Sequence, residues 1–357
     1  MRAVILCAGE GTRMRPLTYS KAKHLIPIAN KPVIDLILQA IKDAGVREIG
    51  IVVSPGTKAS FKSYLQDGSR YDLDLSYIVQ QKPKGLAHAV QCAQGFVGSE
   101  SFLLYLGDNL LENGVRGLVK QFRQGDSHAV ISLVEVDNPR SFGVAWLKNG
   151  EIKKVVEKPD DPSTNLAVIG TYVFDYHIFA AIEKISPSKR GELEITDAIQ
   201  QLIDDGYRVV PHRVTGWWKD VGTPMDMIDA NQLLLDAMIP ETRMKSGISL
   251  EVKGKIAQNE NARVRDSKLI GPVIMGENVV IEGSVIGPYV SIGDGVIIKN
   301  SKIENSIILE KAVITDAKSI NRSLIGRYAE LRVMGDSSSR FLLGDHSQVL
   351  KGSSECW

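Results

Sequence analysis

Cysteine and histidine are scarce in this 357-residue sequence, and their scarcity excludes several kinds of protein. The three cysteines, Cys7, Cys92 and Cys356, lie far apart and form neither a C-x-x-C pair nor a zinc-ligand spacing. A disulfide framework and a cysteine zinc site are therefore not expected. The six histidines are also scattered along the chain. This cysteine usage is typical of a reducing compartment, and we expect a cytoplasmic protein.

Long hydrophobic runs and an excess of charge are missing as well. The opening apolar run, Ala3 to Ala8, is too short for the core of a signal peptide, and no stretch reaches the length of a membrane helix. The 43 basic residues nearly balance the 42 acidic ones. We therefore expect neither nucleic acid nor a membrane as a partner, and any site for an anion must be local.

Short apolar runs alternate with amphipathic segments over the first two thirds of the chain. Residues 1–11 predict a buried strand that enters a glycine turn, residues 31–46 predict a helix, and residues 48–54 predict a second strand. Further alternation predicts a Rossmann-like α/β sheet, mainly parallel, with helices on both faces. Ligands bind such sheets at the carboxyl ends of strands, where Gly9–Arg13 and Gly107-Asp108 are placed.

A repeat replaces this pattern from about Ile248 onward. Apolar residues recur every five or six positions, and glycines fall near the intervening turns; examples are Met275, Ile281, Ile286, Ile292 and Ile298. This hexapeptide repeat predicts a left-handed parallel β-helix. An antiparallel β-sandwich is the alternative, although its turns are usually about 8–12 residues apart. We place the two domains at residues 1–240 and 241–357, with a helix over about 223–239 joining them.

The stretch from Cys7 to Pro27 combines a glycine turn with four cations. It is not a dinucleotide fingerprint, because Met14 occupies the position of the third glycine, and it lacks the Walker A string. Gly9 and Gly11 leave backbone N–H groups open to an oxyanion, Arg13 can fork onto phosphate oxygens, and Lys23 can act as a point charge. The pattern favours a nucleoside triphosphate as the ligand. Arg15 and Lys21 are interpreted as supporting or solvated charges.

The ordered string LCAGEGTRMRPLT (residues 6–18), followed by KHLIP (23–27) and Lys31-Pro32, resembles the opening signature of the sugar nucleotidyltransferases. The resemblance is greatest to the long form of glucose-1-phosphate thymidylyltransferase, which has a β-helical carboxy-terminal domain. Cys7 departs from the alanine usual in the family. The resemblance implies transfer of dTMP from dTTP to glucose 1-phosphate, yielding dTDP-glucose and pyrophosphate. It also implies Mg²⁺ as cofactor, and we expect a homo-oligomer.

The resemblance further implies a nucleotide-binding site. Its residues would be Leu6, Ala8, Gly9, Gly11, Thr12, Arg13, Lys23, Gln80, Gly85 and Asp108. Within this set, Gln80 would pair with the pyrimidine edge, with Gln81 as the alternative register, and the backbone N–H of Gly85 would contact the base. Read without the resemblance, the segment QQKPKGLAHA (80–89) is equally a polar loop that opens a helix.

Metal and sugar sites follow from the same resemblance. Asp108 and Asp220 would bind Mg²⁺, although Asp108 alone could be a helix cap or turn residue. The sugar-phosphate site would contain Gly143, Glu157, Lys158, Gly170, Arg190 and Trp218. Arg13, Lys23 and Lys158 would be the catalytic cations. Read from the residues alone, 149–159 predicts a β-hairpin with an Asn-Gly turn, and Trp217 is expected in the core.

Three other functions stay open. The chain could use UTP or another sugar 1-phosphate on the same scaffold. It could be a bifunctional enzyme whose β-helix acetylates amino-sugar 1-phosphates, but His346 is the only histidine after Ile248 that could serve as general base. It could be a non-catalytic regulatory subunit, against which the intact signature argues.

Overall fold

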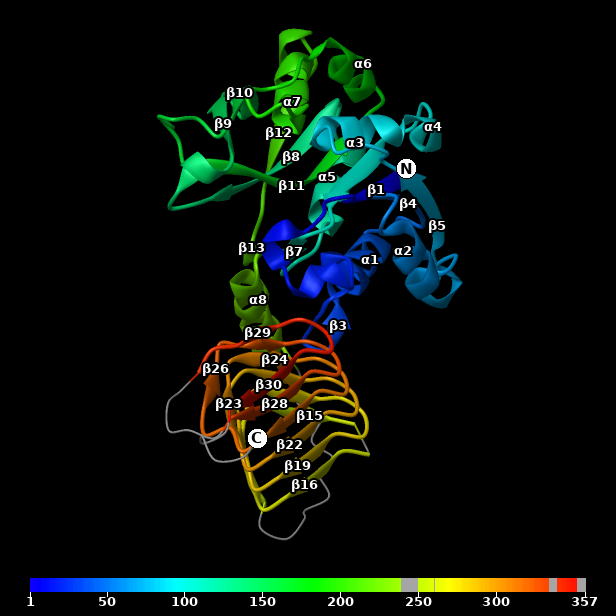
Figure 1. Cartoon of the computed structure of the whole chain (residues 1–357). Helices are drawn as coiled ribbons and strands as arrows, with labels where there is room; N and C mark the ends of the chain where they lie inside the picture. Colours follow the sequence, from blue (N-terminus) through cyan, green and yellow to red (C-terminus); the bar gives the residue numbers. More distant parts are fainter. Residues whose placement is uncertain (239–249, 260, 334–338, 352–357) are drawn as a thin grey trace. The chain divides into compact units, whose positions relative to one another are not determined.

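The computed structural model describes residues 1–238, 250–259, 261–333 and 339–351 (Figure 1). The predicted boundary between residues 240 and 241 and the residue Cys356 lie outside this set. The chain divides into two compact units, one made of Met1–Glu10 and Ile34–Asp220, the other of Gly11–Val33 and Val221–Trp357. Each unit is described by itself. Within the described residues, no helix has both the length and the apolar character needed to cross a membrane.

A nine-stranded mixed sheet is the centre of the first unit. Strand β1 (Arg2–Cys7) lies between β4 (Glu48–Val53) and β6 (Phe102–Leu106) and is parallel to both; β5 (Asp74–Val79) extends the parallel part beyond β4. Strand β11 (Leu166–Phe174) runs antiparallel to β6. The other strands of this unit are β7 (Asn109–Leu111), β8 (Ala129–Glu135), β9 (Gly143–Lys148), β10 (Glu151–Glu157), β12 (Val209–Arg213) and β13 (Trp218–Asp220). The parallel strands about β1 confirm the mainly parallel sheet.

Helices follow most of these strands. They are α1 (Val33–Asp43), α2 (Lys58–Leu65), α3 (Leu86–Cys92), α4 (Gln94–Val97), α5 (Arg116–Gln124), α6 (His177–Lys184) and α7 (Ile195–Asp204), with 3₁₀ turns at Ser69–Tyr71 and Pro139–Ser141. Alternate residues of β1 point to opposite faces of the sheet. Val4 and Leu6 join a core cluster with α3, α6 and α7, while Ala3 and Ile5 are buried on the other face. Burial on both faces agrees with a sheet covered on its two sides.

Two local predictions for this unit are confirmed. Helix α1 begins directly after Pro32, and its side chains Ile34, Ile37, Leu38 and Ile41 are fully buried, as the helical spacing requires. Strands β9 and β10 form the predicted hairpin. Its turn residues Asn149 and Gly150 both have positive φ angles, 53° and 79°, which is the conformation for which Asn-Gly is favoured.

Three parallel sheets form the stacked coils of the second unit (Figure 1). Successive coils bring residues 17 positions apart into contact, as at Ser267 and Ser284. The strands are β14 (Leu250–Lys253), β15 (Ile256–Gln258), β16 (Arg263–Arg265), β17 (Ser267–Ile270), β18 (Val273–Met275), β19 (Val280–Glu282), β20 (Val285–Ile286), β21 (Val290–Ile292), β22 (Ile297–Lys299), β23 (Lys302–Glu304), β24 (Ser306–Ile308), β25 (Val313–Thr315), β26 (Ile320–Asn321), β27 (Leu324–Ile325), β28 (Glu330–Val333), β29 (Leu342–Leu343) and β30 (Gln348–Lys351). This architecture is that of a left-handed β-helix, and the parallel pairing excludes the antiparallel sandwich.

A ladder of buried serines runs through these coils. The hydroxyl of Ser267 accepts the backbone N–H of Ser284, and the hydroxyl of Ser284 accepts that of Ser301. Ser306 and Ser323 repeat the arrangement on another corner. Each hydroxyl also donates to the carbonyl two residues before it, so no hydroxyl of the ladder loses its hydrogen bonds on burial.

Helix α8 (Pro224–Asp236) forms where a helix was predicted over about 223–239, and it belongs to the second unit. It begins at Thr223, whose side chain accepts the backbone N–H of Asp226 while the Asp226 carboxylate accepts the backbone N–H of Thr223. This reciprocal cap explains where the helix starts. Residue 239 lies outside the described residues.

The fully buried Asn231 of α8 joins three segments of the second unit. Its Oδ1 accepts the backbone N–H of Ala29 at 3.0 Å and the hydroxyl of Ser291 at 2.6 Å. Asn30 adds a hydrogen bond to the carbonyl of Ile292, and Ser20 donates to Asp345. Residues 11–33, which include the predicted phosphate-binding cations, are therefore fastened to α8 and to the β-helix. The same segment contains strands β2 (Pro27–Ile28) and β3 (Lys31–Pro32) and 3₁₀ turns at Thr12–Met14, Leu17–Tyr19 and Lys23–Leu25.

We expect Asn231→Ala to lower the free energy of unfolding by about 1–3 kcal/mol, because the part-buried N–H of Ala29 and the buried hydroxyl of Ser291 lose their common acceptor. Urea unfolding measures the change. The control is Gln232→Ala on the same helix, which removes one part-buried bond to Asn305 and should cost about 1 kcal/mol or less. Equal losses for the two variants would contradict the role of Asn231.

Candidate active site

The carboxyl ends of β1 and β6 meet at one edge of the sheet. The backbone N–H of Gly107 donates to the carbonyl of Leu6 at 3.0 Å, so the turn after β1 and the turn after β6 lie side by side. Ala8 is buried, Gly9 is exposed, and the space where a Cβ of Gly9 would lie is open. Backbone N–H groups at this turn can therefore be reached by an anion. Asp108 follows directly on the neighbouring strand.

Asp108 and Asp220 are brought together by a two-stranded ladder. Strand β13 pairs antiparallel with β7, and Asp220 stands opposite Asn109, the residue after Asp108. Asp108 directly precedes β7, and Asp220 ends the strand that pairs with it. Carboxylate oxygens are the ligands that Mg²⁺ takes while it keeps several waters. The donor set fits a hard divalent cation.

Asn109, which the sequence analysis did not single out, contacts three of the predicted site residues. It is 4% exposed, and its Oδ1 accepts the backbone N–H of Gly170 at 3.2 Å and the indole N–H of Trp218 at 2.7 Å. Its Nδ2 donates to Asp108 at 3.0 Å. One amide therefore orients a predicted metal ligand and two predicted sugar-site residues. The signal in the sequence was its place in LYLGDN, directly after Asp108.

Glu157 is the centre of the predicted sugar site. It ends β10, and its Oε2 accepts the hydroxyl of Thr196 at 3.0 Å. Burial raises the pKa of Glu157 above its ordinary value, and the hydrogen bond from Thr196 opposes that rise. Burial also raises the pKa of the Tyr172 hydroxyl, with further contributions from the charges of Glu157 and Asp108. Both carboxylates therefore act on one buried phenol.

Two cations face the Glu157 carboxylate. Arg190 lies 3.4 Å and Lys158 lies 4.0 Å from its Oε1. Arg190 also pairs with Glu192 at 3.1 Å and with Glu194 at 3.7 Å, and all of these groups except Glu194 are partly exposed. The structure thus places Glu157, Lys158 and Arg190 in one cluster, where an anionic ligand would compete with carboxylates for the cations.

Close packing explains the glycines of this region. A Cβ at Gly143 would lie 2.5 Å from the Thr196 methyl group, and one at Gly170 would lie 2.7 Å from Leu106. Gly143 stands opposite Glu157 in the β9–β10 hairpin. Trp218 packs edge-on against Phe142, which directly precedes Gly143, at 5.5 Å between ring centroids.

Hydrogen bonds within the predicted base-reading loop hold its residues in place. Gln80 follows β5, is 6% exposed, and donates from Nε2 to the carbonyl of Gly85 and to Nδ1 of His88. Burial lowers the pKa of His88, with the charge of Lys84 acting in the same direction, and a neutral imidazole suits the acceptor role. Oε1 remains as the acceptor of the Gln80 amide. Gln81 is exposed.

Leu193 connects this loop to the arginine of the sugar site. Its backbone N–H donates to the carbonyl of Lys84, and its carbonyl accepts the N–H of Ala87. Gly85, with φ at +106°, lies so close that an added Cβ would be 2.5 Å from the Leu193 carbonyl oxygen. Only glycine fits there. Leu193 stands between Glu192 and Glu194, both partners of Arg190.

Four predicted residues, Gly11, Thr12, Arg13 and Lys23, belong to the second unit. Gly11 has φ at +63°, and its carbonyl accepts the Thr18 hydroxyl at 2.8 Å, which closes the turn. Thr12 and Arg13 are exposed, and a Cβ at Gly222 would lie 2.9 Å from the Arg13 guanidinium. Lys23 is half-buried.

Arg15, Lys21 and Trp217 have different environments in the structure. Arg15 is exposed over the ring of Tyr19 at 5.1 Å. Lys21 is half-buried, and its pKa is lowered by burial and by Arg327, so it is a supporting rather than a solvated charge. The expectation that Trp217 lies in the core is wrong. Trp217 is partly exposed because its backbone is held at an edge, where its N–H donates to the Glu112 carboxylate.

Comparison with known proteins places the chain in a family. The nucleotidyl transferase family matches residues 2–237, and the GMPPB C-terminal domain family matches residues 269–352. The chain is 40% identical to a glucose-1-phosphate thymidylyltransferase of Streptomyces griseus over 98% of this chain and 99% of that protein. It is 47% identical to the low-salt glycan biosynthesis nucleotidyltransferase Agl11 of Haloferax volcanii, over 73% of this chain and 74% of that protein.

A solved structure agrees with the fold. The crystal structure of a UDP-glucose pyrophosphorylase complexed with UDP-glucose superposes with a TM-score of 0.60 at 28% identity, covering 67% of this chain and 100% of that one. The matched families, the full-length relative and the arrangement of strand-end glycines and carboxylates agree with one another. The chain belongs to the nucleotidyl transferase family, as a sugar-1-phosphate nucleotidyltransferase.

Proposed function

We propose that this enzyme transfers dTMP from dTTP to glucose 1-phosphate, releasing pyrophosphate. The observation that carries the proposal is the β7–β13 ladder, which sets Asp108 beside Asp220 and, through Asn109, beside Gly170 and Trp218 of the sugar site. The relative that matches over almost the whole chain is named as an enzyme of this specificity, which supports the choice of substrates.

The reaction needs no protein nucleophile. A phosphate oxygen of the sugar 1-phosphate attacks the α-phosphorus, the bond from that phosphorus to the bridging oxygen breaks, and pyrophosphate leaves with the electron pair. The barrier is mainly electrostatic, because two polyanions must meet in line while charge develops on the leaving group. Positioning and fixed cations are therefore the means of catalysis.

Each charged group has a proposed part. Arg13 and Lys23 stabilise the α-phosphate and the departing pyrophosphate, with backbone N–H groups of Gly9 and Gly11 beneath the nucleotide. Asp108 and Asp220 would hold the divalent metal that the family uses, which we infer to be Mg²⁺. When bound, that ion neutralises charge on the phosphates.

Lys158 and Arg190 hold the sugar phosphate. In the structure both cations face Glu157, so the arriving phosphate replaces a carboxylate contact, and Glu157 can turn to sugar hydroxyls. The wall for the sugar is Trp218, held by Asn109. Gly143 and Gly170 allow the backbone to approach the ring closely.

Uridylyl transfer is the second candidate, and the base loop gives the reason. Both amide hydrogens of Gln80 are engaged within the loop, so its Oε1 is left to accept the N3–H of a pyrimidine. Thymine and uracil share that N–H, so Gln80 cannot distinguish between them.

Acetyl transfer is not favoured. His346 is exposed at a turn and its ring stacks flat on Tyr328, with 4.9 Å between the centroids.

A coupled pyrophosphate-release assay tests the substrates. We expect the highest kcat/KM with dTTP and glucose 1-phosphate when four nucleoside triphosphates are combined with several sugar 1-phosphates in the presence of Mg²⁺. A clear preference for UTP would replace the proposal by uridylyl transfer. Release of free CoA from acetyl-CoA in the presence of glucosamine 1-phosphate would show that the β-helix is catalytic.

We expect Asp108→Asn to lower kcat by roughly 100- to 1,000-fold, because it removes a charged metal ligand at the reacting phosphates. The thermal midpoint of the metal-free variant should stay close to that of the wild type. The control for charge removal in the same segment is Glu112→Gln, four positions further on, where the carboxylate accepts the backbone N–H of Trp217. Near wild-type turnover by Asp108→Asn would refute the metal site.

Asn109→Ala should raise KM for the sugar 1-phosphate and lower kcat, together reducing kcat/KM by roughly tenfold or more, because Trp218 and Asp108 lose their common partner. The apparent affinity for the nucleoside triphosphate should change less. Asn113→Ala removes an exposed amide bonded to Thr215 and should leave both constants unchanged. Equal effects on both substrates would argue for general loosening of the fold instead.

A further inference from the structure

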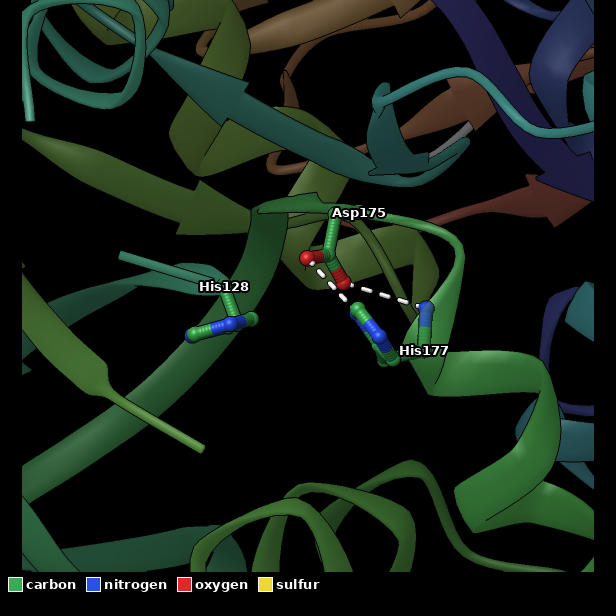
Figure 2. Close-up of side chains that lie close together, drawn as sticks. All are labelled: His128, Asp175 and His177. Carbon is green, nitrogen blue, oxygen red and sulfur yellow. Dashed lines mark hydrogen bonds and ion pairs between the residues drawn. The ribbon is translucent and has the colours of Figure 1, made fainter. Parts of the chain in front are cut away.

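Two histidines and an aspartate gather at the edge of the first unit's sheet away from the proposed active site (Figure 2). His128 directly precedes β8, Asp175 directly follows β11, and His177 begins α6. One nitrogen or oxygen atom from each of the three side chains lies within 4.8 Å of the others, and all three side chains are half-buried. Imidazoles and a carboxylate at this spacing are typical ligands of transition metals.

The sheet itself sets the separation of these residues. The backbone N–H of Asp175 donates to the carbonyl of His128 at 2.9 Å, which continues the β8–β11 ladder by one step. The N–H of His128 donates to the carbonyl of Arg208 at 2.9 Å, which ties it to the start of β12. Three strand ends therefore hold the cluster, and it is not a chance meeting of mobile surface side chains.

Asp175 already orients His177. Its Oδ1 accepts the backbone N–H of His177 at 3.0 Å, and its Oδ2 lies 2.9 Å from the imidazole Nδ1 (Figure 2). This contact holds an imidazole and a carboxylate, both common ligands of transition metals, side by side. Aromatic rings cover the imidazole faces: Tyr207 lies 4.8 Å from His128 and 4.4 Å from His177 between centroids. The ring edges, which carry the nitrogens, are not the surfaces stacked by Tyr207.

The cluster is separate from the carboxylates proposed for catalysis. Strand β11 runs antiparallel to β6, with Phe174 opposite Phe102, so Asp175 lies near the amino end of β6. Asp108 follows the carboxyl end of the same strand. The length of β6 therefore puts the two sites roughly 15 Å apart or more.

We propose that His128, Asp175 and His177 form a second metal site, which binds Zn²⁺ or a similar transition-metal ion and not Mg²⁺. Two nitrogen ligands favour Zn²⁺, whereas Mg²⁺ takes oxygen ligands. Ligand atoms of a tetrahedral zinc site stand about 3.3 Å apart, so the present spacing of up to 4.8 Å must contract a little on binding. His128 can move, because its Nδ1 receives one long hydrogen bond, 3.3 Å from the backbone N–H of Arg208. The bound ion would link the start of β8, the end of β11 and the start of α6, and would thereby stabilise this edge of the sheet.

The test is equilibrium dialysis of the full-length protein against Zn²⁺ in the presence of millimolar Mg²⁺, which occupies the catalytic carboxylates. We expect one Zn²⁺ to bind per chain with saturation, and Zn²⁺ to raise the thermal midpoint. His128→Ala and His177→Ala should each weaken binding by at least about 10- to 100-fold, the range that even an outer partner of a metal ligand can cost. Co²⁺ in place of Zn²⁺ should give visible absorption bands in the wild type that are lost in both variants.

Two controls make the result decisive. His212→Ala removes an imidazole in the same unit that bonds to Gln121, and it should leave Zn²⁺ binding unchanged. His128→Gln, a smaller change in packing against Tyr207, replaces His128→Ala if that variant does not fold. Zinc binding that survives both histidine substitutions but is lost in Cys92→Ser, whose sulfur lies 4.0 Å from His88, overturns the proposal. Absence of saturable binding overturns it as well.

Discussion

A single buried amide, that of Asn109, is the contact on which the proposed active site depends. Its oxygen accepts from Gly170 and Trp218, and its nitrogen donates to Asp108. No side chain other than asparagine offers an acceptor with two lone pairs and a donor at that reach. Asp108 and Trp218, the proposed metal ligand and sugar wall, are therefore linked through one side chain. The second unit repeats the device with Asn231, whose oxygen serves Ala29 and Ser291.

In the predicted sugar site both cations already contact carboxylates, and the three carboxylates outnumber the two cations. Arg190 contacts three carboxylates, and Lys158 faces one of them. The carboxylates hold Lys158 and Arg190 in place and reduce the electrostatic repulsion between these two cations. A sugar phosphate that binds here would replace a carboxylate as the partner of the cations, since the cations are already paired. Selectivity then depends on geometry, because a phosphate must match the arrangement better than the carboxylates do.

Local chemistry made much of the fold predictable. The spacing of Ile34, Ile37 and Ile41 indicated α1, Asn149-Gly150 indicated the hairpin, and the apolar repeat indicated the β-helix, because each pattern is written in neighbouring residues. Trp217 was misjudged, because a tryptophan beside a glycine turn can be held at an edge by its backbone. The serine ladder was not predicted, because single serines between apolar residues do not by themselves indicate a repeated hydrogen bond.

The site was harder to predict than the fold, for a physical reason. Asp220 stands opposite Asn109, the neighbour of Asp108, only because β13 pairs with β7, and nothing in either segment alone specifies that pairing. A family resemblance was needed to bring them together. Asn109 escaped notice because an asparagine at a strand end is most often a turn residue. His128 and Asp175 likewise meet only through the β8–β11 ladder.

The serine ladder sets a unit of length for the β-helix. Each hydroxyl accepts a backbone N–H one coil further on, so the register is measured in whole coils of 16 to 18 residues. A lineage can lengthen or shorten this domain by copying or losing an entire coil, since every corner then finds an equivalent partner. Insertion of a single extra residue into a strand would move every later corner of the β-helix out of register. The ladder thus makes the domain modular, and growth by coils is the change it tolerates.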